Sequence, residues 1–289
     1  MLKKSYLRSR LLQSLNEDGA FRDLTTAAIP GRGRSASAYF VAKSAGIFCG
    51  SALIGGVFRL LDPRMTVFNN KKDGDRVRAG NVLARIRGRE SAILAGERVT
   101  LNLLSRLSGI ATLTDRYVEA VKGTGAAILD TRKTTPLWRD LDRQAVRCGG
   151  GINHRYSLAD AVLVKDNHWQ LLAARGLPAS AVYGPGTPTR RSAVFVAIEA
   201  ANRQQVWEAI AARADIILLD NMPMNRIKEA IVLIKAARKA LGSINPLIEV
   251  SGGVTVKNAA GLARLGVDRI SVGALTHSAP ALDISLEVD

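Results

Sequence analysis

Basic side chains follow two apolar runs in the C-terminal two thirds of the chain. The run at residues 127–129 leads into the stretch DTRKTTP (130–136), which places two cations side by side. A histidine and an arginine come later in the same region, and a lysine ends the next run. The five side chains are Arg132, Lys133, His154, Arg155 and Lys165. Because a cluster of cations attracts anions of high charge density, we expect these side chains to bind a small molecule that carries several negative charges.

Two acids follow the next two apolar runs. Glu199 ends the stretch VFVAIE, and Asp220 ends IILLD. Carboxylates within a cationic site commonly hold a divalent metal ion through oxygen contacts or hydrogen-bond to sugar hydroxyl groups. They serve equally well as ion-pair partners for neighbouring cations. The residue pattern alone leaves both interpretations open.

Glycines follow the last two apolar runs, in the stretches SGG and VGA. Glycine lets backbone N–H groups approach a phosphate closely, and a helix start of the type TVKN comes shortly after the first stretch. Two such loops after the last two strands of a barrel are typical of a phosphate site. We therefore expect a phosphate group beside these residues: Ser251, Gly252, Gly253, Val272, Gly273 and Ala274.

Six apolar runs position these side chains: AAIL, AVLV, VFVAI, IILL, PLIEV and RISV. The residues directly after the runs are 21 to 34 positions apart, which suits a strand, a crossover helix and two loops. Repetition of that unit predicts a parallel sheet, and six copies favour closure into a barrel with its ligand at the carboxyl ends of the strands. Residues 224–242 predict the clearest helix, with Gly242 as its C-terminal cap. Residues 177–192, rich in Pro and Gly, predict a loop.

The first hundred residues follow a different pattern. Short alternating stretches separated by glycines predict strands and turns, and the uncharged residues 44–58 are expected to form packed strand and turn. Residues 97–123 then place apolar side chains at helical spacing. They predict either one long helix or two helices broken at Gly109.

Composition argues against several classes of protein. The net charge of +16 comes with basic runs of at most two residues, whereas nucleic-acid binders concentrate their cations beside aromatic side chains. Residues 44–58 are shorter than the span of about 20 apolar residues that a membrane helix requires. The charged start of the chain has no apolar segment behind it, so we expect a cytoplasmic protein. Cys49 and Cys148 are far apart in the sequence and are expected to be small buried residues in a reducing compartment.

Eight stretches of the chain resemble one enzyme family. They are DLTT (23–26), ER…LNLLSRLSGIAT (97–112), DTRKTTP (130–136), AVRCGGGINHR (145–155), VLVKDNH (162–168), IILLDN (216–221), EVSGGVT (249–255) and ISVGALTHSAPALDISL (270–286). With these motifs in this order, the chain resembles quinolinate phosphoribosyltransferase, also called nicotinate-nucleotide pyrophosphorylase (carboxylating), over nearly its whole length.

The resemblance implies a reaction and a set of substrate contacts. Quinolinate and phosphoribosyl pyrophosphate would give nicotinate mononucleotide, pyrophosphate and carbon dioxide, with Mg²⁺, in de novo NAD synthesis. The residues implied to surround quinolinate are Arg98, Arg132, His154, Arg155 and Lys165, and Thr131 is a further implied substrate-binding residue. Arg98 is implied to come from the neighbouring subunit of a homodimer.

The resemblance also implies roles for the remaining site residues. Lys133 would serve quinolinate, pyrophosphate or both, and it forms the implied catalytic set with Glu199 and Asp220. The two acids would position the ribose hydroxyl groups and Mg²⁺. The 5′-phosphate would bind at residues 251–253 and 272–274. The implied partners are these substrates and a second copy of the chain, and include neither nucleic acid nor membrane.

The implied fold is an open, incomplete α/β barrel with an N-terminal α/β sandwich domain. Residues 1–108 would form the sandwich with the C-terminal tail 275–289 packed on it, and residues 109–274 the barrel. The chain departs from the family pattern at Leu137 and Trp138, which stand where a glycine usually follows the proline. Alternatives are a related pyrophosphorylase with a different acceptor, an inactive paralogue, and a basic nucleic-acid-binding protein whose binding would depend on salt.

Overall fold

The computed structural model describes residues 4–29, 33–242 and 245–289; the first three residues of the charged N-terminal stretch lie outside this description. The chain divides into two compact units. The first comprises Met1–Asp115, Thr134–Gly150 and Leu275–Asp289, and the second comprises Arg116–Lys133 and Gly151–Ala274. Within the described residues, no helix is long and apolar enough to cross a membrane.

The first unit contains an antiparallel four-stranded sheet with the order β12-β1-β5-β3, and the short ribbon β2-β4. The last strand of the chain pairs with the first, with Phe40 opposite Leu286. The strands are β1 (Ser35–Ala42), β2 (Gly46–Ile47), β3 (Thr66–Asn69), β4 (Arg76–Val77), β5 (Val82–Arg89) and β12 (Ile284–Val288).

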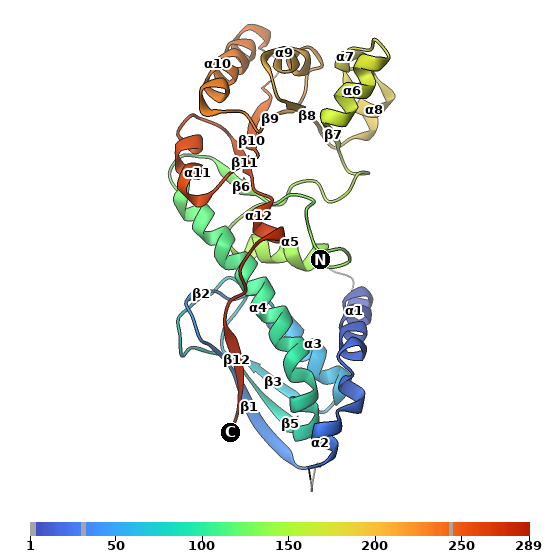
Figure 1. Ribbon diagram of the computed structural model, residues 1–289, viewed down its shortest axis with the longest axis vertical. Helices are drawn as coiled ribbons and strands as arrows, with labels where there is room; N and C mark the ends of the chain where they lie inside the picture. The colour runs from blue at the N-terminus through green and yellow to red at the C-terminus, as the bar shows by residue number, and fades with distance from the viewer. Residues whose placement is uncertain (1–3, 30–32, 243–244) are drawn as a thin grey trace. The chain divides into compact units, whose positions relative to one another are not determined.

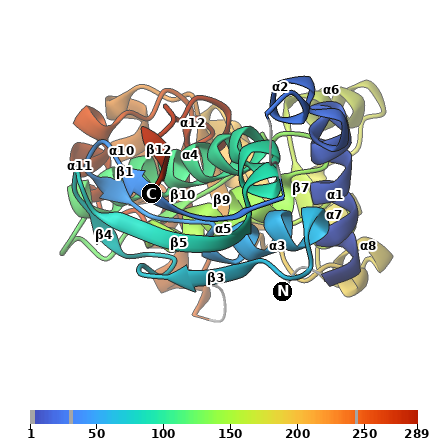
Figure 2. The same ribbon diagram turned by 90° about the horizontal axis from the view of Figure 1, so that it is seen from below.

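Helices cover one face of this sheet (Figure 2). The core lies between the sheet and two of the helices, α3 and α4, and it includes the fully buried side chains of Phe40, Ile54 and Phe58. The helices that lie wholly or mostly in the first unit are α1 (Lys4–Glu17), η1 (Ala20–Arg22), α2 (Leu24–Ala27), α3 (Ser51–Leu61), α4 (Glu90–Ala120), α5 (Arg139–Cys148) and α12 (Ala274–His277). The two layers form the expected α/β sandwich.

The prediction of packed strand and turn for residues 44–58 is wrong from Ser51 onward, where α3 begins. Its buried residues are spaced as on one helix face, with Leu53, Ile54, Val57 and Phe58 directed into the core. Glycines inside the helix obscured this pattern. A Cβ atom on Gly56 would lie 2.7 Å from Leu11 of α1, so the glycine permits close packing of two helices.

Helix α4 is continuous from Glu90 to Ala120, so of the two predictions for this segment, the single long helix is correct. Gly109 does not break the helix. A Cβ atom at this position would overlap the carbonyl oxygen of Pro280. The glycine is therefore required because the C-terminal segment crosses the helix at close range.

The second unit contains a six-stranded parallel sheet with the order β6-β11-β10-β9-β8-β7 (Figure 1). The strands are β6 (Ala127–Leu129), β7 (Val162–Val164), β8 (Val196–Ala200), β9 (Ile216–Asp220), β10 (Leu247–Ser251) and β11 (Arg269–Ser271). All six predicted strands are confirmed. The last strand pairs with the first, as in a closed barrel, but β6 and β7 do not pair. An open, incomplete barrel is therefore confirmed, and its gap falls between the first two strands.

Helices connect these strands and lie around the sheet (Figure 1). They are α6 (Asp166–Ala174), α7 (Ala179–Tyr183), α8 (Pro188–Ser192), α9 (Arg203–Ala211), α10 (Met224–Leu241) and α11 (Val256–Ala263). The predicted helix with its Gly242 cap is confirmed by α10. The loop predicted for residues 177–192 is wrong, because it contains α7 and α8. Pro178 and Thr187-Pro188 start these helices, and proline at a helix start is favourable rather than disruptive.

Candidate active site

The interior of the open barrel carries polar side chains in two layers. Residues aligned on parallel neighbours point to the same face of a sheet. Glu249 aligns with Arg269 on one side and with Leu218 on the other, and Leu218 aligns with Glu199. Two residues further toward the carboxyl ends, Ser251 aligns with Asp220 and Ser271. The register therefore brings Glu199 and Asp220 to the same face, as the chemistry proposed for them requires.

The two acids influence each other. Burial raises the pKa of Glu199, and the nearby carboxylate of Asp220 raises it further, while Lys165 opposes both effects. Lys165 Nζ lies 3.7 Å from Glu199 Oε2. The backbone of Glu199 is fixed because its carbonyl oxygen accepts a hydrogen bond of 2.7 Å from Trp169 Nε1. Two carboxylates in this arrangement favour the binding of a cation between them.

Arg132 and Arg155 form the basic part of the site. Arg155 is buried, and its Nη1 donates to the carbonyl oxygen of Ala161 at 2.7 Å. Burial lowers the pKa of Arg155, and the charge of Arg132 lowers it further. The Nε atom of Arg132 is buried and makes no hydrogen bond to any described residue. Two guanidinium groups that repel each other, one with an unsatisfied buried donor, form a site that an anion would stabilise.

His154 is held from both sides. Its Nδ1 accepts the Arg155 N–H at 2.7 Å, and its Nε2 lies 3.3 Å from Oε1 of the fully buried Glu249. Its ring packs edge-on against Phe195. Both ring nitrogens are therefore engaged within the chain. An anion that contacts His154 would have to share Nε2 with Glu249.

A buried aspartate fixes the segment that carries His154 and Arg155. Asp130 directly follows β6 and is fully buried. Its Oδ1 accepts the His154 N–H at 2.7 Å, and its Oδ2 accepts from Asn153 Nδ2 at 2.6 Å. A parallel bridge between Leu129 and Ile152 places this segment beside β6. The segment thereby occupies the open side of the barrel next to β6.

Lys133 and Arg98 are the two remaining predicted cations of the site. Lys133 is exposed, and its N–H donates to the Thr131 hydroxyl at 3.1 Å. Arg98 lies in the first unit, exposed on α4. The structure therefore groups the predicted cations of β6 and β7 within one unit, while Arg98 belongs to the other.

The loop after β10 is shaped by its glycines. Gly252 and Gly253 have φ values of 89° and 60°, in the region that glycine favours. A Cβ atom on Gly252 would overlap the Asn221 side chain. Asn221 donates its N–H to the Ser251 carbonyl oxygen at 3.0 Å, and its side-chain amide to Asp220 Oδ2 at 2.7 Å. The loop thus packs tightly against the acid at the end of β9.

The second predicted loop lies at the end of β11. Val272 is buried, and its N–H donates to the Leu129 carbonyl oxygen at 2.9 Å. This bond ties the loop to β6. Gly273 and Ala274 follow it and are half-buried. The expected helix start after the first loop is also present, since Thr255 caps α11 and forms a capping box with Asn258.

Sequence reasoning missed six polar residues that support the site: Asp130, Glu249 and Ser271 are buried, Asn153 and Arg269 are half-buried, and Asn221 is exposed. Glu249 lies inside an otherwise apolar run and Arg269 begins the next one, and that signal could have identified them. A charged residue in a buried strand requires a partner. In this structure Glu249 and Arg269 are partners, with 3.0 Å between Arg269 Nε and Glu249 Oε2.

The fold and these groups define an α/β-barrel enzyme whose site, at the carboxyl ends of the strands, suits an anionic substrate. Comparison with known proteins identifies the enzyme family within this class. Residues 23–108 match the family described as quinolinate phosphoribosyl transferase, N-terminal domain, and residues 110–287 match the corresponding C-terminal domain. The chain belongs to the quinolinate phosphoribosyltransferase family.

Individual relatives agree with this assignment. The chain is 42% identical over 275 residues to the probable nicotinate-nucleotide pyrophosphorylase (carboxylating) of Bacillus subtilis, covering 94% of this chain and 90% of that protein. It is 36% identical to the enzyme of Mycobacterium leprae of the same name, without "probable", covering 97% and 96%. The crystal structure of NadC from Streptococcus pyogenes superimposes with a TM-score of 0.87 at 36% identity, covering 100% of this chain and 98% of that one.

Proposed function

We propose that the chain transfers the phosphoribosyl group of phosphoribosyl pyrophosphate to quinolinate, with loss of carbon dioxide. The products are nicotinate mononucleotide and pyrophosphate, as in de novo NAD synthesis. The pairing of Arg132 with Arg155 carries this proposal most directly, because two adjacent guanidinium groups suit the two adjacent carboxylates of quinolinate. The names of the relatives support the same reaction.

The quinolinate carboxylates bind to Arg132, Arg155 and Lys165 in this proposal. The buried Nε of Arg132 gains a partner, and the repulsion between the two guanidinium groups is relieved. Thr131 and Lys133 lie on the same segment as Arg132 and contribute further donors. His154 holds the segment in place, and it contacts the substrate only by sharing its Nε2 with Glu249.

Glu199 and Asp220 hold the ribose and a magnesium ion. Carboxylate oxygens suit Mg²⁺, which proteins usually bind through one or two carboxylates together with substrate phosphates and water. The pKa of Glu199 is raised first by burial and then by repulsion from Asp220, and a bound cation would relieve that repulsion. When bound, Mg²⁺ stabilises the negative charge of the departing pyrophosphate. The glycine loops at residues 251–253 and 272–274 hold the 5′-phosphate through backbone N–H groups.

The side chains of the protein act mainly by orientation and electrostatics. Lys133 stabilises negative charge as pyrophosphate leaves, while Glu199 and Asp220 stabilise the positive charge that develops on the ribose ring. The quinolinate nitrogen, held in line by the two arginines, then bonds to C1′. Loss of the 2-carboxylate follows, because the positively charged ring accepts the electrons of the breaking bond.

The proposal extends to assembly and location. A homodimer in which Arg98 reaches the site of the partner subunit is consistent with its exposed position on α4. The proposal includes the cytoplasmic location expected from the sequence. Sedimentation analysis tests the dimer, and mixing an Arg98→Ala variant with a variant inactive at Asp220 tests sharing. Recovery of activity on mixing is expected if each subunit completes the site of the other.

The decisive experiment is a product assay with quinolinate, phosphoribosyl pyrophosphate and Mg²⁺. We expect nicotinate mononucleotide and carbon dioxide to form in equal amounts. Turnover of nicotinate, or of another acceptor, in place of quinolinate would point instead to a related pyrophosphorylase. An absence of turnover combined with salt-dependent binding to DNA or RNA would favour the nucleic-acid alternative.

A further inference from the structure

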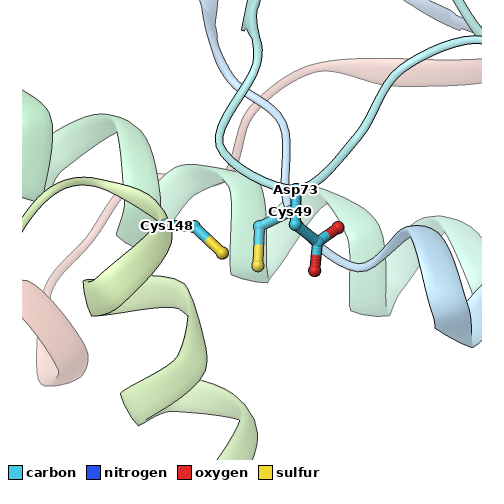
Figure 3. Close-up of side chains that lie close together, drawn as sticks. All are labelled: Cys49, Asp73 and Cys148. Atoms are coloured by element: carbon cyan, nitrogen blue, oxygen red, sulfur yellow. The ribbon is translucent and has the colours of Figure 1, made fainter.

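Two cysteines far apart in the sequence meet in the first unit. Cys49 directly precedes the N-terminal cap of α3, and Cys148 is the last residue of α5. Figure 3 shows their sulfur atoms close to each other, with Asp73 beside them. The two sulfurs and a carboxylate oxygen of Asp73 all lie within 4.8 Å of one another. Both thiols are free.

Neighbouring groups hold both cysteines in place. The Cys49 N–H donates to the Ser108 hydroxyl at 3.0 Å, and that hydroxyl lies 3.3 Å from the Cys49 carbonyl oxygen. Cys148 is followed by Gly149, where a Cβ atom would overlap the Ala111 carbonyl oxygen of α4. Because both backbones are already fixed in a closely packed region, linking the sulfurs requires little further loss of conformational freedom.

Both carboxylate oxygens of Asp73 already accept hydrogen bonds within the protein, which argues against a metal site. Its Oδ1 accepts the N–H groups of Gly50 and Ser51 at 2.9 and 2.8 Å, which caps α3. Its Oδ2 accepts from Gln144 Nε2 at 2.8 Å. A metal ion would therefore find two sulfur ligands and a carboxylate that is largely saturated, whereas a structural zinc site needs four ligands.

The two thiols differ in the way that disulfide chemistry requires. Cys49 is fully buried, whereas Cys148 is half-buried and therefore open to a small oxidant. A hydrogen bond with Cys49 lowers the pKa of Cys148, while the same bond and burial raise the pKa of Cys49. Cys148 is thus the more reactive thiol, and Cys49 is positioned to react with its oxidised form.

We propose that Cys49 and Cys148 form a reversible disulfide, which makes them a modification site for peroxide-type oxidants. The Cys148 thiolate attacks one oxygen of hydrogen peroxide, which gives a sulfenic acid and hydroxide. The Cys49 sulfur then attacks the Cys148 sulfur, a disulfide forms, and the sulfenic oxygen leaves as water. Two thiols and one peroxide thus yield one disulfide and two waters. A dithiol reductant reverses the reaction through thiol–disulfide exchange.

The chain has only two cysteines, so any loss of thiols on oxidation can be assigned to Cys49 and Cys148. The full-length protein is treated with hydrogen peroxide, and its thiols are titrated under denaturing conditions. We expect both thiols to disappear together, with a mass loss of two hydrogen atoms per chain, and to return after dithiothreitol. We also expect the oxidised form to melt about 5 °C above the reduced form, because the crosslink constrains a long loop of the unfolded chain.

Two variants provide the controls. In Cys49→Ser, Cys148 is expected to stop at the sulfenic acid, detected with dimedone, and to gain no thermal stability. In Cys148→Ser, Cys49 is expected to resist the oxidant. Thiols that remain titratable after peroxide, or crosslinks that join two chains, would overturn the proposal. Binding of one zinc ion per chain that protects both thiols from peroxide would also overturn it and would establish a metal site instead.

Discussion

Replacement of Glu249 by glutamine tests the buried network beneath the candidate site. Glu249 is fully buried and contacts three groups: the Ser271 hydroxyl, His154 Nε2 at 3.3 Å and Arg269 Nε at 3.0 Å. Glutamine keeps the shape but removes the charge, and so leaves the guanidinium of Arg269, whose side chain is only 15% exposed, without this counterion. Breaking one half of a buried ion pair costs about 3–5 kcal/mol, and we expect Glu249→Gln to lower the free energy of unfolding by about that amount.

The effect of Glu249→Gln on the free energy of unfolding should depend on pH. Burial alone would raise the pKa of Glu249, but the interactions with His154, Arg269 and Ser271 outweigh it and lower the pKa. A carboxyl with a lowered pKa in the folded state stabilises the protein above its unfolded-state pKa, and this contribution is lost as the pH falls through the folded-state value. The wild-type advantage over Glu249→Gln should therefore be full at pH 7 and shrink in acid below about pH 4.

Urea unfolding of both proteins at a series of pH values measures this difference, with Glu287→Gln as the control. Glu287 pairs with Lys43 on the surface at 3.0 Å, and exposed pairs contribute little to stability because solvent screens them. The kinetic readout is kcat/KM for quinolinate, which should fall in Glu249→Gln because His154 loses its support. Equal stability of Glu249→Gln and wild type at pH 7, or a difference that does not change with pH, would refute the reasoning.

Three further substitutions test other parts of the account. Arg132→Ala should weaken quinolinate binding by about 2–5 kcal/mol, measured by calorimetry, with little change for phosphoribosyl pyrophosphate; unchanged quinolinate affinity would contradict its assignment. Leu137→Gly should raise the free energy of unfolding by about 0.5–1 kcal/mol, measured in urea. Leu137 has a φ of 69°, which glycine adopts without strain, and its side chain is exposed, so little packing is lost. A loss of stability would argue against backbone strain at this position. Gly252→Ala should raise KM for phosphoribosyl pyrophosphate about tenfold, because the added Cβ atom would overlap the Asn221 side chain and displace the loop. An unchanged KM in steady-state kinetics would count against the assignment of this loop to the phosphate.

Much of the barrel could be predicted because its strands are buried and apolar. A continuous apolar run that ends in polar or glycine residues is a strong signal, and all six such runs are strands. The position of the cations and acids at the strand ends follows from the same pattern, since parallel strands present their carboxyl ends on one edge. The division into domains at residue 108 remains a prediction.

The elements that were predicted wrongly have identifiable causes. Helix α3 contains Gly55 and Gly56, which suggested turns, although Gly56 instead permits close contact with α1. Helix α7 begins directly after Pro178 and helix α8 begins at Pro188, and these prolines suggested a loop. In each case tertiary packing or position in the helix decided the structure, and local composition does not reveal either.

The buried network could not be derived from the sequence because it depends on strand register. Glu249 and Arg269 are twenty positions apart, and only the pairing of β10 with β11 places them side by side. The same holds for Asp130, which is followed by a polar segment and resembles any acid at a strand end. Its function in holding His154 depends on a segment that returns to β6 after the intervening helix α5.

The central claim is that Arg132 and Arg155 together bind two adjacent carboxylates. Calorimetric titration of the protein with quinolinate and with nicotinate tests this most directly, because nicotinate lacks the 2-carboxylate but keeps the ring and the 3-carboxylate. We predict that quinolinate binds at least about tenfold more tightly, and that the preference disappears in Arg132→Ala. Equal affinities for the two ligands in the wild-type protein would contradict the account.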